Sequence, residues 1–172
     1  MNIRKEHIKS YLFGLIMTAV CIFIDQWTKL LVVDKIKGND GLILIKGVFQ
    51  LHYLENRGAA FGIMQNQKIY FVICGVLISV LVGFIYGKIP ISKRYSPLRI
   101  CSVLIVSGAL GNMIDRIRLG YVVDFFYFEL INFPIFNMAD IYVVIATSLL
   151  VLLLLFYYKE EELSFLTLKK KV

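Results

Sequence analysis

Residues 11–33 read YLFGLIMTAVCIFIDQWTKLLVV, and this segment is almost wholly apolar until Asp25. About 20 mostly apolar residues are enough for a helix to cross the hydrocarbon core of a bilayer. Three later segments have the same character, at residues 69–89, 98–117 and 141–158. The sequence therefore predicts an all-α integral membrane protein, with four transmembrane helices in a single membrane domain over residues 1–172.

The composition is that of a membrane protein, because 59% of the 172 residues are hydrophobic and only 18% are charged. A net charge of +7 would also suit a nucleic-acid partner, but most of the basic residues lie near the ends of the apolar segments. Eleven of the 19 lysines and arginines form three clusters: Arg4, Lys5 and Lys9; Lys88, Lys93, Arg94 and Arg99; Lys159, Lys169, Lys170 and Lys171. We therefore expect topology signals and no nucleic-acid partner.

The three basic clusters fall on one side of the membrane if the chain crosses it four times. An excess of lysine and arginine in the connecting loops marks the cytoplasmic side. We therefore expect both termini, and the loop between the second and third helices, to lie in the cytoplasm. Residues 34–68 and 118–137 should then face outward.

The longest segment outside the predicted helices, residues 34–68, has a pattern of its own. Residues 42–45 (LILI) and 48–53 (VFQLHY) are rich in β-branched and aromatic residues, and Lys46-Gly47 separates them. Two such runs around a short turn predict a pair of antiparallel strands. We expect a small extracytoplasmic β element between the first and second helices.

Polar side chains interrupt the outer parts of two predicted helices. At a rise of 1.5 Å per residue, Asp25 lies about 21 Å along the first helix from Tyr11, in the outer third of a core about 30 Å thick. Asn112 lies about the same distance along the third helix. Asp115 and Arg116 follow it on the same helix face.

Three more polar residues are expected in the same layer. Asp124 lies in the outer connection, and Asn137 and Asp140 lie where the fourth helix enters the membrane. Polar groups at membrane depth are costly and usually face the protein interior at a functional site. Because side chains from three helices converge near the outer face, the sequence predicts a functional site there.

Several of these residues also have a purely structural explanation. Asp115 could form an ion pair with the neighbouring Arg116, and Asp140 could serve only as a helix N-cap. Asp25 could belong to an interfacial anchor in which Lys29 reaches the lipid headgroups. The convergence of these residues at one depth is what favours a site.

The available residue types limit the chemistry of such a site. The chain has two histidines, His7 and His52, and no cysteine near the polar layer, which argues against a Ser/His or Cys/His nucleophile. No H-E-x-x-H motif occurs, so we expect neither a metal nor another cofactor. Two carboxylates that share one proton remain as general acid and base. The alternative is a subunit of a small proton- or ion-coupled transporter, because intramembrane carboxylates also serve in transport.

Five short motifs resemble, in the same order, those of the bacterial lipoprotein signal peptidases, the signal peptidase II family. Together they extend over most of the chain. They are DQWTK at residues 25–29, NRGAAF at 56–61, GALGNMIDR at 108–116, VVDF at 122–125 and FNMAD at 136–140.

The resemblance implies an aspartyl endopeptidase of the bacterial plasma membrane, with its active site near the extracytoplasmic face. Such an enzyme removes the signal peptide of a diacylglyceryl-modified prolipoprotein by cutting just before the lipidated cysteine. Asp124 and Asp140 match the catalytic pair. The residues that match supporting or substrate-binding positions are Asp25, Asn56, Gly58, Asn112, Arg116 and Asn137. Prolipoproteins and membrane lipids are the implied partners, and we expect the protein to work as a monomer.

Overall fold

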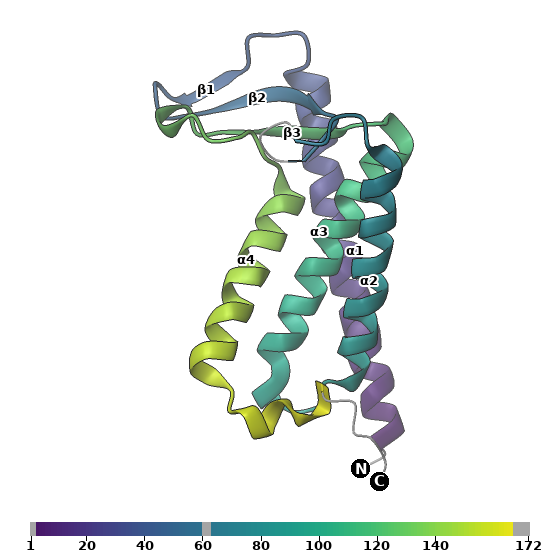
Figure 1. Ribbon diagram of the computed structural model, residues 1–172. Helices are drawn as coiled ribbons and strands as arrows, with labels where there is room; N and C mark the ends of the chain where they lie inside the picture. The colour runs from purple at the N-terminus through teal and green to yellow at the C-terminus, as the bar shows by residue number, and fades with distance from the viewer. Residues whose placement is uncertain (1–2, 60–62, 167–172) are drawn as a thin grey trace.

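The computed structural model of the protein describes residues 3–59 and 63–166. Long helices run side by side, and a small sheet lies across one end of them (Figure 1). The helices are α1 (Ile3–Lys35), α2 (Lys68–Lys88), α3 (Ser96–Leu119) and α4 (Met138–Leu152). Within the described residues, four helical segments are long and apolar enough to cross a membrane, which confirms the predicted fold class.

Some predictions fall outside the described residues. Residues 60 and 61 of the NRGAAF motif are among them. The same holds for three lysines of the third basic cluster, Lys169, Lys170 and Lys171.

The helix boundaries differ from those of the apolar segments mainly in α1, which begins at Ile3 and so includes the polar residues before the apolar segment. α3 begins with Ser96-Pro97, where proline fits because an N–H in the first turn of a helix has no partner within the helix. Gly120, with φ 85°, ends α3 in the left-handed conformation. α4 continues as a π-helical turn, η4 (Leu153–Tyr157).

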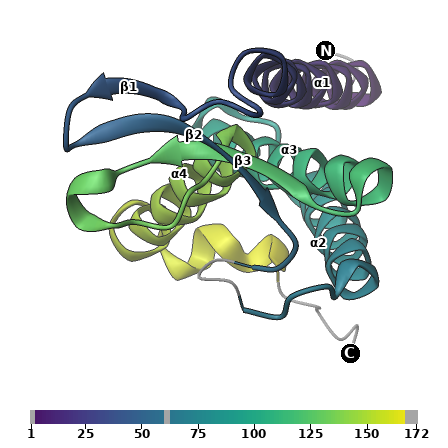
Figure 2. The same cartoon turned by 90° about the horizontal axis from the view of Figure 1, so that it is seen from above.

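The sheet has three antiparallel strands in the order β1 (Leu42–Ile45), β2 (Phe49–Asn56) and β3 (Val122–Tyr127). β1 and β2 confirm the β element predicted between the first two helices. β3 is a strand that the sequence did not predict, and it comes from the connection between α3 and α4. Its pairing with β2 brings two distant parts of the chain together across the ends of α3 and α4 (Figure 2).

α3 is the central helix, because it packs against each of the other three. Its contact with α4 depends on a glycine, since a Cβ atom at Gly108 would lie 2.5 Å from the backbone oxygen of Ala139. No side chain can be accommodated at that separation without moving one of the two backbones. Gly108 therefore lets the first turn of α4 lie directly against α3.

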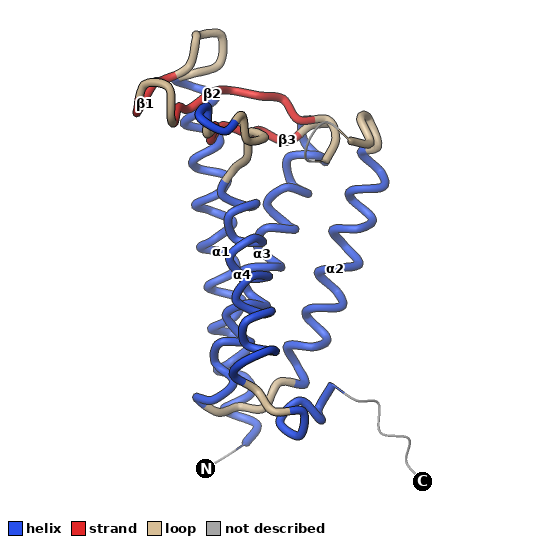
Figure 3. Tube along the Cα trace, turned by 60° about the vertical axis from the view of Figure 1, so that its left-hand side comes forward, coloured by secondary structure: helices blue, strands red, loops and turns tan. Residues whose placement is uncertain are grey.

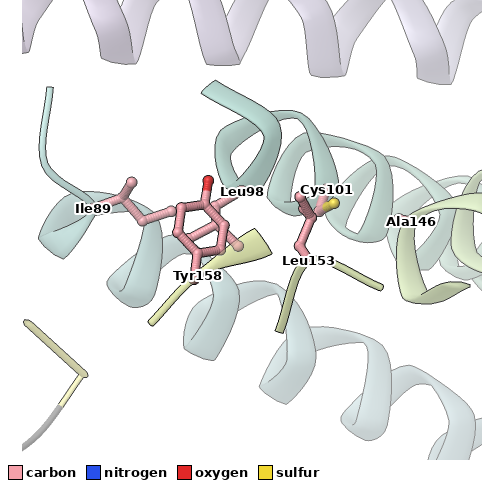
Figure 4. Packing of buried hydrophobic residues seen from close by; sticks show 6 residues of the cluster. All are labelled: Ile89, Leu98, Cys101, Ala146, Leu153 and Tyr158. Atoms are coloured by element: carbon pink, nitrogen blue, oxygen red, sulfur yellow. The ribbon is translucent and has the colours of Figure 1, made fainter. Parts of the chain in front are cut away.

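Two clusters of buried apolar residues lie at opposite ends of the helical bundle. The cluster far from the sheet consists of Ile89, Leu98, Cys101, Ala146, Leu153 and Tyr158 (Figure 4). The other cluster joins Val32 and Ile36 of α1 to Val123 and Phe125 of β3. Figure 3 shows the same polarity, with the strands at one end and the short helix η5 (Glu160–Leu166) at the other. The second cluster fixes β3 against α1.

Candidate active site

Asp124 lies within β3 and is only 1% exposed. Each of its carboxylate oxygens accepts a hydrogen bond from an asparagine side chain. Asn56, at the end of β2, donates to Oδ2 at 2.8 Å, and Asn137 donates to Oδ1 at 2.6 Å. The strand pairing explains the first contact, because Asn56 lies opposite Val122 and therefore diagonally across from Asp124.

Asp140 is the third residue of α4, and its carboxylate takes part in a capping box. The backbone N–H of Asn137 donates to Oδ2 of Asp140 at 3.1 Å, and the backbone N–H of Asp140 donates to Oδ1 of Asn137 at 3.1 Å. The structural alternative for Asp140, a role as the helix N-cap, does not hold, because Asn137 occupies that position. Asn137 holds Asp140 through its backbone and Asp124 through its side chain.

Asn112 of α3 connects this pair of aspartates to Lys29 of α1. Its Nδ2 donates to Oδ1 of Asp140 at 2.8 Å. Its Oδ1 accepts one hydrogen bond from Nδ2 of Asn137 at 3.1 Å and another from Nζ of Lys29 at 3.0 Å. Asparagine side chains from a strand, a helix and a helix cap therefore orient the two carboxylates.

Lys29 lies at the centre of a buried ion cluster that the sequence did not predict. Its Nζ is 2.9 Å from Oδ2 of Asp25 and 2.9 Å from Oδ2 of Asp115. All three residues are no more than 3% exposed, so Lys29 does not reach the lipid headgroups. The predicted pair of Asp115 with Arg116 is also wrong, because adjacent residues of a helix do not face each other. The spacing of Asp25 and Lys29 by four residues was the one local signal of this cluster.

The ion cluster also holds the backbone beside each aspartate of the pair. Oδ1 of Asp25 accepts a hydrogen bond at 3.0 Å from the backbone N–H of Ala139, the residue before Asp140.

Oδ2 of Asp115 makes the equivalent contact on the other side of the pair. It accepts a hydrogen bond at 3.1 Å from the backbone N–H of Val123, the residue before Asp124. The cluster therefore positions both aspartates, although it touches neither carboxylate.

Gly58 and Arg116 stabilise the segment that follows β2. The backbone N–H of Gly58 donates to Oδ1 of Asn56 at 2.9 Å, which orients the amide that reaches Asp124. Nη2 of Arg116 donates to the carbonyl oxygen of Gly58 at 3.0 Å. A Cβ atom at Gly58 would lie 2.5 Å from the carbonyl oxygen of Ile63, so only glycine fits there.

All of the residues predicted for the site thus lie in one connected network, at the junction of the helices and the sheet. They are Asp25, Asn56, Gly58, Asn112, Arg116, Asp124, Asn137 and Asp140. Among residues 3–59 and 63–166, no group of three or more histidine, cysteine or acidic side chains is placed to hold a metal ion.

Burial raises the pKa of Asp124 to about 7, and the charge of Asp140 contributes in the same direction. Hydrogen bonds from Asn56 and Asn137, together with the positive charge of Lys29, partly oppose this rise in pKa. Near neutral pH the pair of aspartates therefore keeps one proton easily. Such a pair can act as general base through its ionised member and as general acid through its protonated member.

Comparisons of sequence identify the relatives of this chain. A profile of the family described as "Signal peptidase (SPase) II" matches residues 17–156. A lipoprotein signal peptidase of Halothermothrix orenii is 42% identical over 134 residues, which cover 78% of this chain and 89% of that protein. A lipoprotein signal peptidase of Streptococcus thermophilus is 46% identical over 128 residues, which cover 74% of this chain and 82% of that protein.

Comparisons of structure agree with those of sequence. A solved structure described as a bacterial membrane enzyme has a TM-score of 0.75 and 28% identity, and the match covers 86% of this chain and 92% of that chain. A second structure with the same description has a TM-score of 0.72 and 28% identity, over 85% and 94% of the two chains. These matches favour the peptidase over the transporter alternative. The chain belongs to the signal peptidase II family, and it is a multi-pass membrane aspartic peptidase of bacteria.

Proposed function

We propose that Asp124 and Asp140 are the catalytic pair of a lipoprotein signal peptidase, which removes signal peptides from prolipoproteins. The observation that supports this assignment is the position of Asn137, which donates one hydrogen bond to each aspartate. Because one residue holds both carboxylates, the charge of Asp140 helps to raise the pKa of Asp124. A pair with that property is suited to share one proton.

In the proposed reaction, the ionised aspartate takes a proton from a water molecule as its oxygen attacks the carbonyl carbon of the scissile peptide bond. The protonated aspartate gives its proton to the carbonyl oxygen. These steps give a tetrahedral intermediate with two hydroxyl groups on the former carbonyl carbon. When the C–N bond breaks, the leaving nitrogen takes a proton from the pair, and one of the two hydroxyl groups gives its proton back to the pair. The pair then holds one proton again, and the asparagines keep both carboxylates aligned throughout.

The proposed substrate carries a diacylglyceryl group, and the cut falls just before the lipidated cysteine. Exposed side chains on the helices are largely apolar, as Phe23, Leu77 and Val144 illustrate at 67%, 62% and 61% exposed. A substrate held in the bilayer by acyl chains would therefore approach the helices laterally. Acyl chains contribute about 0.8 kcal/mol for each CH₂ group that leaves water, so they hold the substrate in the bilayer beside the enzyme.

We also propose that the site lies at the extracytoplasmic face and that the monomer is the working unit. The orientation rests on the positive-inside rule, because Lys88, Lys93 and Arg94 lie at the end of the bundle opposite the sheet. The monomer is proposed because one chain is sufficient to supply both aspartates and the three asparagines that hydrogen-bond to them.

Incubating the purified protein in detergent with lipidated and unlipidated forms of one prolipoprotein tests the function and the substrate class together. We expect the lipidated form to be cut just before its modified cysteine, and the unlipidated form to be cut at least about a hundredfold more slowly. Equal rates on the two forms would indicate a general intramembrane protease and contradict the proposed substrate.

A further inference from the structure

A cavity of about 1130 Å³ lies between α1, α2 and α3, toward the end of the bundle opposite the sheet. Its lining runs along α1 from Glu6 to Cys21 and along α3 from Ser96 to Leu104, and Tyr86 of α2 closes one side. None of the residues predicted for the active site lines it. The cavity is therefore separate from the pair of aspartates.

The deep part of the cavity has the length and character of one bilayer leaflet. At 1.5 Å per residue, Cys21 lies about 16 Å along α1 from Ser10, which is about half of a hydrocarbon core about 30 Å thick. Phe13, Met17 and Val103 line this part. Phe13 is 62% exposed, so the cavity is open on the surface that faces lipid. An acyl chain fits this length and this lining.

The mouth of the cavity carries positive charge. Lys9, Lys93 and Arg99 line it, with His7 and Glu6 beside them. Lys9 pairs with Glu6 at 3.0 Å. Within the part of the chain that the structure describes, neither Lys93 nor Arg99 forms an ion pair with a carboxylate. Two positive charges at the mouth therefore have no carboxylate partner among the described residues.

The guanidinium of Arg99 is held in place by the protein. Nη1 donates to Oγ of Ser10 at 2.6 Å, Nη2 donates to the carbonyl oxygen of Ile89, and the group lies over the ring of Tyr86. A guanidinium has five N–H donors, and these two contacts leave the group able to bind a phosphate as well.

We propose that this cavity binds one anionic phospholipid, with its phosphate at Lys93 and Arg99 and one acyl chain along Phe13, Met17 and Val103. Basic pockets between transmembrane helices are suited to anionic headgroups, and here an apolar channel of matching length continues from the pocket. The signal peptide of a substrate is a poorer occupant, because its n-region is positively charged and would be repelled at the mouth. This inference is independent of the assignment of the catalytic pair.

The test uses the full-length protein in a non-ionic detergent, titrated with phosphatidylglycerol or with phosphatidylcholine of the same acyl chains. Native mass spectrometry counts the bound lipids. We expect one phosphatidylglycerol molecule to be retained at concentrations where phosphatidylcholine is lost. Lys93→Ala and Arg99→Gln should each weaken the retention of phosphatidylglycerol about fivefold. Lys159→Ala is the matched control, because Lys159 is exposed and does not line the cavity.

A second pair of variants tests the apolar channel without changing charge. Val103→Phe should block the channel and reduce lipid retention, whereas Val144→Phe, on an exposed face of α4, should not.

Equal retention of the two lipids, or equal effects of Lys93→Ala and Lys159→Ala, would overturn the proposal. Displacement of phosphatidylglycerol by a synthetic signal peptide would assign the cavity to the substrate instead. Because Lys93 is exposed and unpaired among the described residues, its variant keeps the test decisive even if Val103→Phe does not fold.

Discussion

The ammonium nitrogen of Lys29 lies 2.9 Å from a carboxylate oxygen of Asp115, and both side chains are only 4% exposed. The same nitrogen is 2.9 Å from Asp25, so one cation neutralises two buried acids. Since the backbone of Ala139 and that of Val123 bind to these acids, the ion cluster links stability to the geometry of the candidate active site.

Replacing Lys29 with methionine should therefore destabilise the protein strongly. The change leaves two buried carboxylates without their counter-ion, and breaking a buried pair in this way costs about 3–5 kcal/mol. Thermal unfolding of the purified protein in detergent measures the effect. Lys35→Met is the control, because the pair of Lys35 with Asp34 is exposed and should contribute little to stability. Equal melting temperatures for the two variants would show that the ion cluster is not stabilising.

Asp124→Asn and Asp140→Asn should each abolish cleavage of a lipidated prolipoprotein while leaving a folded protein that still binds it. Asparagine keeps the shape of aspartate but cannot exchange a proton, so we expect a loss of at least about a hundredfold in turnover. Single-turnover cleavage gives the rate, and co-purification with the substrate reports binding. Asp34→Asn makes the same chemical change at an exposed position and should retain activity. Near-normal turnover by Asp124→Asn would remove it from the catalytic pair.

Activity should show a bell-shaped dependence on pH. Because the pKa of Asp124 is raised to about 7, increasing the pH through that value removes the shared proton and kcat/KM should fall. On the acid side, a second proton leaves no general base, and the rate should fall again. A profile that stays flat from pH 5 to about pH 9 would contradict the shared proton.

Asn56→Ala should move the alkaline limb of this profile to higher pH. The hydrogen bond from Asn56 favours the ionised form of Asp124 and so holds its pKa down. Losing a hydrogen bond to a charged group should raise that pKa by about one unit. Asn39→Ala, in an exposed turn at the same end of the molecule, should leave the limb in place. If the alkaline limb of Asn56→Ala lies at the same pH as that of the unmodified protein, Asp124 does not control this limb.

Gly108→Ala should destabilise the packing of α3 against α4, because the new Cβ atom would meet the backbone of Ala139 at 2.5 Å. Overpacking of this kind costs about 1–3 kcal/mol. Gly83→Ala is the matched control, because a Cβ atom there would meet nothing within 4 Å and alanine is the better helix former. We therefore expect a lower melting temperature for the first variant and an unchanged or higher one for the second.

Cysteine labelling tests the orientation. In a chain whose Cys21, Cys74 and Cys101 are replaced by alanine, a single cysteine is placed at Asn39 or at Lys93. A reagent that cannot cross the membrane should label the first in intact cells and the second only after lysis. The reverse pattern would place the candidate active site on the cytoplasmic side.

The helices could be predicted from the sequence because a bilayer imposes a length and an apolar composition on every segment that crosses it. The strand β3 could not, since its six residues are stabilised by pairing with β2, which precedes it by some 65 residues. Residues 122–127 (VVDFFY) are rich in β-branched and aromatic residues, but no second run across a short turn accompanies them to mark a hairpin.

The candidate site shows the same limit. Asp124, Asp140 and the asparagines could be selected from their depth and from the family motifs, because these signals lie in short segments. The role of Lys29 could not, because its position beside Trp27 is also typical of a headgroup anchor. Only the packing of α1 against α3 places Asp115 opposite Lys29.

The capping box at the start of α4 has a consequence for biosynthesis. Asp124 leaves the ribosome before Asn137, which donates one of its hydrogen bonds, and before Asp140, which completes the pair at the start of α4. A nascent chain therefore lacks the complete pair of aspartates until the start of α4 has been made. If these two aspartates are the catalytic pair, we expect proteolysis to begin only after α4 has been inserted.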